Sequence, residues 1–363
     1  MNTSTFDWTM AADSSSRSLI VNFWNASRYY FNESSDGESW GGHYWPQAHA
    51  LDVLVDAYLR SGDDFYRSYF EPWLTGVRRA NGNRWANNYI DDMEWIGLAA
   101  LRAYHATGIN DFLTVCREVW DGTTDDMDDE NAAFGIKKAW TDAGEGGIFW
   151  ESRKNRHSKN ACSNGPAAIL AAHLYQAFGD TEDLEWAKKI YHWQRNTLFN
   201  HESGAIYDNL NTTTGAINRR WVFTYNQGTF IGAAVELYKI TGEISYIDDA
   251  VKAADYTITT LIDTDDNILK SEGTGDGGLF KGIFIRYFAQ LILSDGISDD
   301  IRNRYMAFMQ HNSETLWHEG TLRHKILFGP YWKTPPEEHT GHTAHLSGCM
   351  LIEAMAMLKK KGL

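Results

Sequence analysis

The stretch Tyr104-His-Ala-Thr-Gly108-Ile-Asn-Asp-Phe112 decides the fold, because it ends one apolar helical pattern at a glycine and begins another after a polar residue. Glycine supplies the left-handed backbone that ends a helix, and Asp, Ser or Thr can cap the helix that follows. The same pattern returns around Gly62, Gly179 and Gly242, and in a looser form around Gly296. The chain is therefore predicted to be a series of helical hairpins joined by loops of variable length.

Apolar periodicity on both sides of these turns predicts about twelve helices. Those that end at the turns are rich in small and apolar residues and are expected near 45–60, 89–106, 160–178, 225–240 and 279–294. Their partners are amphipathic and are expected near 62–79, 110–121, 181–199, 243–263 and 297–316, while helices near 16–32 and 341–359 would complete a sixth pair. Buried helices inside and amphipathic helices outside imply two concentric layers. Six hairpins closed into a ring predict an all-α fold, an (α/α)6 barrel, with residues 1–363 in a single domain.

The composition narrows the classes of partner. A formal net charge of −15 argues against nucleic acid and anionic membrane surfaces, because both attract basic patches. The chain has no apolar run long enough for a membrane-spanning helix. The 15 Trp, 18 Tyr and 17 Phe are unusually many, and Trp beside polar residues suits stacking against sugar rings. We therefore expect a polysaccharide or oligosaccharide substrate, no nucleic acid, no membrane, and a monomer.

The cysteines and histidines indicate neither a metal nor a cofactor. Cys116, Cys162 and Cys349 are odd in number and widely spaced, so buried free thiols are expected. His342 and His345 have an H-x-x-H spacing but lack the glutamate of a zinc site. The first 30 residues lack a basic segment followed by an apolar one. A cytoplasmic location is therefore expected for the chain as written, and secretion if an export signal was removed.

All inner helices of such a barrel point their N-termini at one end, so the residues before them should line a shared cavity. These segments are polar and aromatic: Trp40–Trp45, Asn87–Asp92, Gly146–Glu151, Lys159–Asn164, Phe223–Gly228, Asp276–Gly282 and Phe328–Trp332. The cavity at this end of the barrel is the predicted functional site.

Asp91-Asp92 is one of seven Asp-Asp pairs, and it alone falls where an inner helix opens into that cavity. An ionised carboxylate beside a protonated one can cleave a glycosidic bond. The alternative is an N-cap followed by a first-turn carboxylate that the helix dipole stabilises. Neighbours on a helix point about 100° apart, so the pair is expected to straddle the loop–helix junction. Adjacent residues suit the short carboxyl separation of a retaining enzyme, and burial by rings such as Tyr89 and Trp95 should raise one pKa.

Other residues near the inner-helix starts are candidates for binding a sugar. Amides offer donors and acceptors together, although helix caps and turns use the same residues. Aromatic rings could stack on sugars, although most tryptophans must belong to the core. An Asp and a Lys before and inside the fifth inner helix could contact hydroxyls or pair with each other. The candidates are the amides Asn160, Asn164, Asn226 and Gln227, the aromatic residues Trp45, Tyr89, Trp150, Tyr225 and Trp332, and the charged residues Asp276 and Lys281.

The run Tyr89-Ile-Asp-Asp-Met-Glu-Trp95 resembles the signature of glycoside hydrolase family 76, the endo-α-1,6-mannanases. Further segments resemble the family in the same order: Gly146–Trp150, Lys159–Asn164, Tyr225–Gly228 with Glu236–Tyr238, and Phe280–Arg286. The resemblance spans nearly the whole chain and implies an (α/α)6 barrel, retention, no metal and an α-1,6-linked mannose backbone as substrate. In the family the first aspartate of the pair is the nucleophile and the second the acid/base, which implies these roles for Asp91 and Asp92. The chain departs from the family in its lack of a visible export signal and in the run Cys162–Pro166, where a more regular helix start is expected.

The leading hypothesis is a glycoside hydrolase, an endo-acting α-1,6-mannanase that forms a covalent glycosyl-aspartyl intermediate. A transglycosylase of mannosyl glycans would use the same residues with a sugar hydroxyl in place of water. A sugar epimerase on the same barrel would work through histidines such as His342 and His345. A non-catalytic glycan-binding protein would use the site without any reaction.

Overall fold

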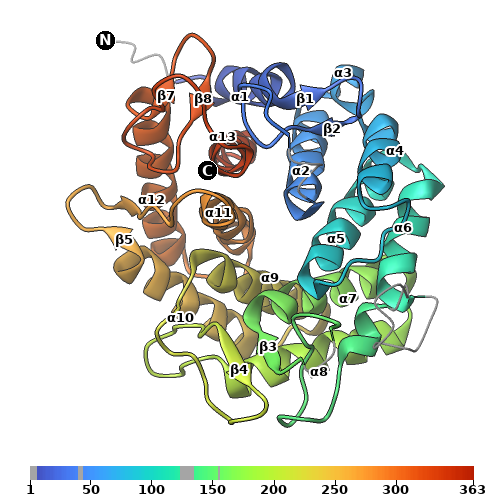
Figure 1. Cartoon of the computed structure of the whole chain (residues 1–363). Helices are drawn as coiled ribbons and strands as arrows, with labels where there is room; N and C mark the ends of the chain where they lie inside the picture. Colours follow the sequence, from blue (N-terminus) through green and yellow to red (C-terminus); the bar gives the residue numbers. More distant parts are fainter. Residues whose placement is uncertain (1–5, 40–43, 123–134, 154–155) are drawn as a thin grey trace.

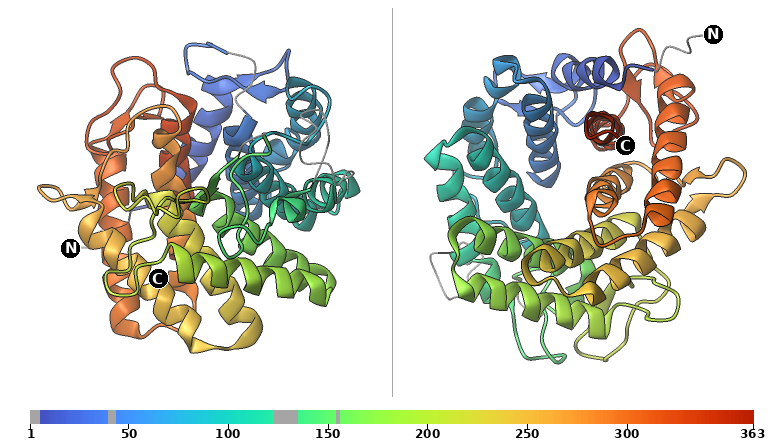
Figure 2. Two further views of the ribbon diagram at one scale, coloured as in Figure 1. Left: turned by 60° about the horizontal axis from the view of Figure 1, so that its bottom comes forward. Right: turned by 180° about the vertical axis from the view of Figure 1, so that it is seen from behind.

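The computed structural model describes residues 6–39, 44–122, 135–153 and 156–363, whose helices form two concentric layers (Figure 1). The inner layer consists of α2 (Tyr44–Ser61), α5 (Ile90–Thr107), α7 (Gly165–Phe178), α9 (Thr224–Thr241), α11 (Gly277–Leu293) and α13 (His342–Lys360). Each inner helix packs against the next, and α13 packs against α2, so the ring is closed. The outer layer consists of α1 (Trp8–Phe23), α4 (Phe70–Ala80), α6 (Asn110–Asp121), α8 (Thr181–Thr197), α10 (Ile244–Thr260) and α12 (Asp299–His318), as the two views of Figure 2 also show. The predicted (α/α)6 barrel is confirmed.

The inner and outer helices differ in how many of their residues are buried. In α9 every residue from 226 to 237 is buried, which is possible because small residues let the inner helices approach closely. A side chain at Gly228 would place its Cβ 2.6 Å from Phe284 Cα of α11, closer than real contacts allow. The outer helix α8 instead buries one stripe, with Ala187, Ile190, Tyr191 and Gln194 at helical spacing.

The predicted glycine turns are confirmed at four of the five positions. Gly62, Gly108, Gly179 and Gly242 all have positive φ angles between 70° and 74°, and the last three are the C-caps of their helices. The looser fifth turn differs, because α11 ends at Ser294 in an extended conformation. Gly296 has an ordinary φ there and packs closely against Ile247 and Tyr238, where a Cβ would not fit.

Three predicted helix boundaries are wrong. The opening helix covers Trp8–Phe23 and not 16–32, because the Asp7 side chain caps it by accepting from Thr9 N and Met10 N. The predicted helix 62–79 is split into α3 (Asp64–Arg67) and α4, since Pro72 has no N–H for a bond to the previous turn and lies in the first turn of α4. The predicted helix 160–178 begins only at Gly165.

Short antiparallel strand pairs occupy loops that helical periodicity cannot predict. Two of them explain shifted helix boundaries, since β1 with β2 follows α1, and β3 leads into a 3-10 turn (Ala161–Ser163) before α7. The pairs are β1 (Trp24–Asn25) with β2 (Tyr30–Phe31), β3 (Ser158–Asn160) with β4 (Asn209–Asn211), β5 (Ile262–Asp263) with β6 (Ile268–Leu269), and β7 (Thr321–Leu322) with β8 (Leu327–Phe328).

The first turns of the inner helices gather at one end of the barrel. Trp45 Nε1 of α2 donates to Asp276 Oδ1 just before α11 over 3.0 Å. Ser347 Oγ of α13 donates to Gly278 O of α11 over 2.7 Å. The polar and aromatic segments that precede these helices therefore meet there, as predicted. Residues 40–43 of the first segment lie outside the described residues.

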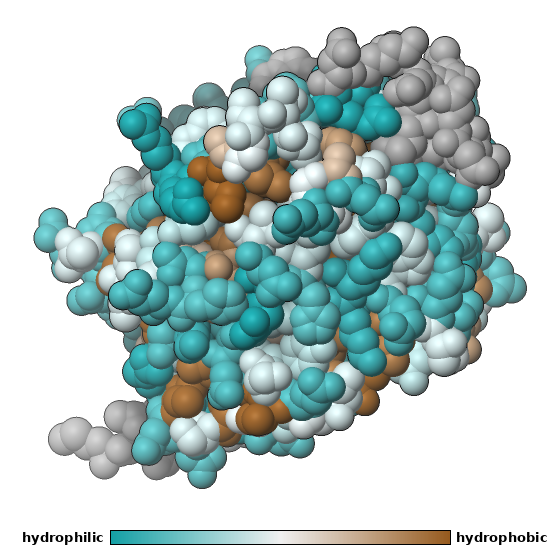
Figure 3. Space-filling model, turned by 90° about the horizontal axis from the view of Figure 1, so that it is seen from below, coloured by the Kyte–Doolittle hydropathy of each residue, from teal (hydrophilic) through white to brown (hydrophobic). Residues whose placement is uncertain are grey.

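The outer surface agrees with the acidic, polar composition. The face in Figure 3 is mostly hydrophilic, with smaller apolar areas between charged side chains. Among the described helices, none combines the length and the apolar character needed to cross a membrane.

Candidate active site

The loop at residues 150–152 fixes the start of α5 and thereby places Asp91 and Asp92. Ile90 N donates to Trp150 O over 2.9 Å, and Ser152 N donates to Asn88 O over 2.9 Å. Both aspartates lie inside the first turn of α5, which has Tyr89 as its N-cap residue. The expectation that the pair straddles the loop–helix junction is therefore wrong, because the bond from Ile90 starts the helix one residue before the pair.

Burial raises the pKa values of both carboxyls, and that of Asp92 is raised further by neighbouring charges. Both lie deep in the protein yet keep part of their surface accessible. Burial raises the pKa of Asp91 to about 7, against hydrogen bonding from the Cys162 thiol, the Trp150 indole and the local backbone N–H groups, which lowers it. Burial, and then the negative charges of Asp91 and Asp276, raise the pKa of Asp92 well above its usual value. Asp91 is therefore the first to ionise, and Asp92 keeps its proton.

A third carboxyl, that of Glu94, lies on the same face of α5 as Asp91. Glu94 is completely buried, and neither carboxyl oxygen makes a full hydrogen bond within the described chain. Burial foremost, and then the charge of Asp91, raise the pKa of Glu94 well above its usual value, although the Ala167 N–H of α7 lowers it. Glu94 is therefore neutral and adds no charge to the pair. Its spacing of three residues from Asp91 could have indicated this position.

Five of the predicted binding residues lie at this end with accessible surface: Tyr89, Trp150, Asn160, Tyr225 and Asp276. The rings of Tyr89 and Trp150 are 5.0 Å apart at 46°. Tyr225 lies close enough to Asp91 for the carboxylate to raise the phenol pKa, although burial is the larger cause. Its ring stacks on Phe280 with centroids 3.9 Å apart. The structure therefore brings these residues together with the catalytic candidates.

Trp45 and Asn160 are partly committed to other contacts. Trp45 is only 8% exposed, and its indole N–H is used by Asp276. Asn160 Oδ1 accepts from Ser158 Oγ over 2.6 Å, while the rest of its amide stays at the half-exposed edge of β3. The half-exposed Asn160 amide remains suitable for a sugar, whereas Trp45 is almost completely covered.

The three buried amides support the walls of the site and are poorly placed to touch a substrate. Asn164 Oδ1 accepts from Ile148 N over 2.9 Å, and Asn164 Nδ2 donates to Ile148 O and Asn160 O. Asn226 Nδ2 donates to Asp208 Oδ1, and the Gln227 amide bonds to the backbone of residues 204–206. All three side chains are completely buried, which argues against the direct contact that the sequence suggested.

Lys281 and Trp332 are buried as well. Lys281 Nζ donates to Pro330 O over 2.8 Å and lies 4.1 Å from the centre of the Trp332 ring. Burial lowers the pKa of Lys281 to about 7, although Glu272 raises it. Lys281 therefore holds the 330–332 segment on α11 and does not form the ion pair with Asp276 that was considered.

Several residues of the site were missed in the sequence. Cys162 was expected only as a buried thiol, but it lies between Asp91 and Tyr225. The Tyr44 hydroxyl donates to Trp85 O over 2.6 Å, near enough to Asp92 for that charge to help raise its pKa after burial. These contacts join segments far apart in the chain, so no local pattern could have shown them.

The histidines considered for an epimerase belong to the core. His345 is completely buried between Phe23 and Phe328, with ring centroids 5.0 and 5.2 Å away, and its Nδ1 accepts from Phe328 N. Burial lowers the pKa of His345 to about 3. His342 is also buried and stacks on Phe31. Across the described ranges, no group of three or more His, Cys, Asp or Glu side chains could hold a metal ion.

Known proteins resemble this chain in sequence and in fold. The sequence model for Glycosyl hydrolase family 76 matches residues 7–363. The α-1,6-mannanase GH76A of Salegentibacter sp. HEL1_6 is 41% identical and has a TM-score of 0.90, with 97% of this chain and 100% of that chain covered. That structure is an inactive variant, with two consecutive aspartates replaced by alanine, in complex with α-1,6-mannotetrose.

Two further relatives extend the comparison. The Lin0763 protein from Listeria innocua is 33% identical, with a TM-score of 0.86 and coverage of 98% of this chain and 99% of that chain. The mannan endo-1,6-alpha-mannosidase DCW1 of Saccharomyces cerevisiae is 30% identical over 222 residues, which are 55% of this chain and 46% of that protein. The match therefore spans about half the length of this curated relative. The match over residues 7–363 shows that the chain belongs to glycosyl hydrolase family 76.

Proposed function

We propose that this protein is an endo-acting α-1,6-mannanase that retains the anomeric configuration through a covalent mannosyl–Asp91 intermediate. The observation that carries the proposal is the adjacent pair of buried carboxyls at the shared end of the inner helices, in which the pKa of Asp92 is raised by the neighbouring charge of Asp91 as well as by burial, so that Asp91 ionises first. The loss of activity in the Salegentibacter enzyme without two consecutive aspartates, and its bound α-1,6-mannotetrose, support both the pair and the substrate.

The reaction follows from the order in which the two carboxyls ionise. Asp91 attacks the anomeric carbon while Asp92 gives its proton to the leaving glycosidic oxygen, so the glycosidic bond breaks as the ester bond forms. Asp92, now ionised, takes a proton from water, and the water oxygen displaces Asp91 from the same carbon. Cys162 and Trp150 lower the pKa of Asp91, and they therefore favour its carboxylate as it leaves.

Two alternatives, a transglycosylase and a non-catalytic glycan-binding protein, would use the same site. A transglycosylase needs the same pair and differs only in the acceptor, while a non-catalytic binding protein needs no carboxyl held protonated at neutral pH. The burial of His345 argues against an epimerase that works through it.

Incubation with unbranched α-1,6-mannan tests the proposal. We expect a ladder of internal fragments at early times, and no cleavage of mannans that carry only α-1,2 or α-1,3 linkages. Addition of a short mannooligosaccharide acceptor should leave the rate of free reducing-end formation nearly unchanged. Longer transfer products in place of hydrolysis would favour the transglycosylase.

The pH dependence of kcat/KM is expected to report the burial of the pair. Activity should rise near pH 7 as Asp91 ionises and fall at higher pH as Asp92 loses its proton. An exposed aspartate would give a rising limb near pH 4, about three units lower.

Trp150→Phe should move the rising limb to higher pH, because it removes an N–H that lowers the pKa of Asp91. A wild-type limb near pH 4 in the pH–rate profile would contradict this account.

An aromatic row leads away from the pair and supports binding of a long chain. Trp221, Phe223 and Tyr225 alternate in sequence, and the extended backbone of Phe223 places alternate side chains on one face. Ring centroids are 6.2 Å apart between Trp221 and Phe223 and 6.0 Å apart between Phe223 and Tyr225. Trp221 is 57% exposed, although it is large and apolar. A row of rings that ends on such a residue is typical of a binding surface.

Trp221→Ala is therefore expected to lower kcat/KM on polymeric α-1,6-mannan by about fivefold, the amount that a lost ring contact of about 1 kcal/mol produces. The smallest oligosaccharide that is cleaved should be nearly unaffected, because it does not reach Trp221. Phe178→Ala is a matched control, since Phe178 is 40% exposed at the C-terminal end of α7. Equal losses on long and short substrates would contradict a role for Trp221 in binding the chain.

A further inference from the structure

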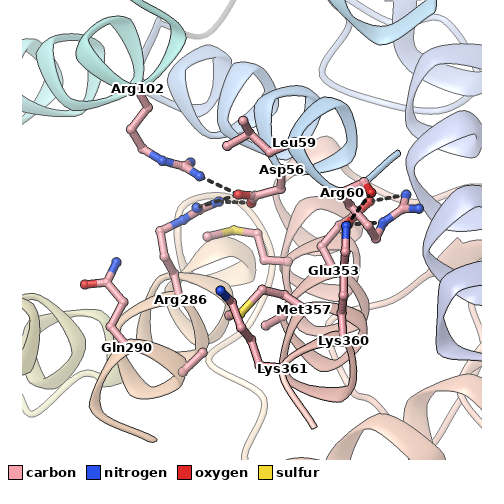
Figure 4. A pocket seen from close by; sticks show the side chains of 13 residues that line it. Asp56, Leu59, Arg60, Arg102, Arg286, Gln290, Glu353, Met357, Lys360 and Lys361 are labelled. Atoms are coloured by element: carbon pink, nitrogen blue, oxygen red, sulfur yellow. Dashed lines mark hydrogen bonds and ion pairs between the residues drawn. The ribbon is translucent and has the colours of Figure 1, made fainter. Parts of the chain in front are cut away.

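Figure 4 shows a cavity of about 460 Å³ from close by. It lies at the other end of the inner ring from the aspartate pair. Its lining comes from the C-terminal halves of α2, α5, α11 and α13. Arg102 in its wall follows Asp92 by ten residues along α5, which is about 15 Å at 1.5 Å per residue. The cavity is therefore separate from the site where the glycan is proposed to react.

An ion-pair network lies between the end of the inner ring that holds the aspartate pair and the end that holds the cavity. Asp56 of α2 accepts from Arg102 of α5 and from Arg286 of α11, the latter over 2.9 Å. Arg102 also binds Asp52, one turn nearer the aspartate pair. The network joins α2 to α11, which do not pack directly in the ring, so it crosses the interior of the barrel.

The lining is cationic, unlike the chain as a whole. Figure 4 shows basic side chains gathered on several sides of the cavity. Two carboxylates, Asp56 and Glu353, also line it. The basic residues of the lining are Arg60, Arg102, Arg286, Lys360 and Lys361.

Pairing reduces this positive charge without removing it. Arg60 binds Glu353 and Asp13, while Asp52 and Asp56 share the other two arginines. Counted with these four carboxylates, the five basic side chains leave one positive charge in excess, in a chain of net charge −15. An anion is therefore favoured at this place.

Two buried polar atoms of the wall have no hydrogen-bond partner in the described chain: Gln290 Oε1, and Arg286 Nε, which lies 3.9 Å from Asp52 Oδ2 in an ion pair. A buried donor or acceptor without a partner costs free energy, which a polar ligand group could recover. Lys361 is exposed at the rim, and no ion pair engages it within the described ranges. For an ionised carboxylate, which only accepts hydrogen bonds, the cavity thus offers one free charge and one donor without a hydrogen bond, Arg286 Nε.

The remaining lining is aliphatic. Its apolar members are Leu59, which is 59% exposed, and Ala289, Met350, Ala354 and Met357. None of the lining residues that the structure describes is aromatic, so they offer no stacking surface of the kind that suits a sugar. Cavities of this volume with an apolar wall and a few polar groups are typical of sites for small molecules.

We propose that this cavity binds a small monoanion, a carboxylate that carries an apolar chain. The carboxylate lies by Lys361 and Arg286, and the chain lies along Leu59, Met350 and Met357. The site is independent of the proposed mannanase activity, because it lies beyond the ion-pair network and shares no residue with the aspartate pair.

Three probes with the same chain and different head groups test the proposal on the full-length protein by titration calorimetry: octanoate, octylammonium and octyl glucoside. We expect saturable binding of one octanoate per chain, at least about tenfold tighter than that of the other two probes. Lys361→Glu should weaken octanoate binding at least about fivefold, since it reverses the free charge. Lys188→Glu on the outer helix α8 is the matched control and should leave binding unchanged.

Each outcome decides the proposal. Absence of saturable octanoate binding would overturn it, as would equal binding of octyl glucoside, which would show apolar affinity only. Equal effects of the Lys361 and Lys188 variants would also overturn it, because the anion would then not lie in this cavity. Met357→Asp should weaken octanoate binding as well, and its thermal unfolding distinguishes a lost contact from a lost fold.

Discussion

Asp91→Asn is expected to lower kcat on unbranched α-1,6-mannan by at least about 10,000-fold, because an amide cannot form the glycosyl ester. Asp92→Asn is expected to lower it by about 100- to 10,000-fold, the range for loss of a general acid and base. Initial rates of reducing-end formation measure both. Asp299 and Asp300 provide a matched control, since they are also an Asp-Asp pair in the first turn of a helix, α12, but that helix is outer. Their Asn variants should keep wild-type rates.

These losses should not come from unfolding. The pKa values of Asp91 and Asp92 are raised in the folded protein, so the stability linked to them is present below the unfolded-state pKa near 4 and is lost as the pH rises through the folded values. At pH 8 the raised pKa values of both groups therefore oppose folding. Each Asn variant should melt at or above the wild-type temperature at pH 8, and wild-type turnover by both variants would refute the assigned roles.

Asp56→Asn is expected to lower the free energy of unfolding by about 3 kcal/mol, because it leaves Arg102 and Arg286 without their shared carboxylate. This is the lower part of the range for buried pairs, since the Asp56 side chain is 24% exposed. Although burial alone would raise the pKa of Asp56, the two guanidinium groups hold it below its usual value. The stabilisation is therefore present at neutral pH and is lost as the pH falls through that lowered pKa.

Urea denaturation at pH 7 measures the loss. Asp63→Asn is the matched control, because the Arg17–Asp63 ion pair is nearly half exposed on both sides and should contribute no more than about 1 kcal/mol. If Asp56→Asn were as mild as Asp63→Asn, the network across the barrel would not stabilise the fold.

The barrel could be predicted because the residues that end its inner helices can be recognised from the local sequence. A glycine with a positive φ ends α5, α7 and α9, and such a residue is visible in the sequence without any knowledge of the neighbours. The strands β1 to β8 are two or three residues long, too short for a periodic pattern. The split before α4 depended on a single residue, Pro72, within an otherwise continuous helical pattern.

The location of the site could be predicted for the same reason. Which side chains there stay accessible to a substrate, and which are held in buried hydrogen bonds, could not be predicted. Asn160 and Asn164 lie four residues apart in one segment, yet only Asn160 keeps accessible surface. The amide of Asn164 is taken by Ile148, across a loop of sixteen residues. Contacts of this kind depend on how distant segments pass one another. The same holds for Cys162, whose place beside Asp91 arises where α5, α7 and α9 meet.

The anomeric form of the first product tests the central claim most directly. ¹H NMR of α-1,6-mannotetraose in the first minutes of cleavage distinguishes the two anomers before they equilibrate. A covalent intermediate on Asp91 involves two inversions, so the account predicts that the α-anomer forms first and the β-anomer grows in later. Initial formation of the β-anomer would show direct attack by water and would contradict the account.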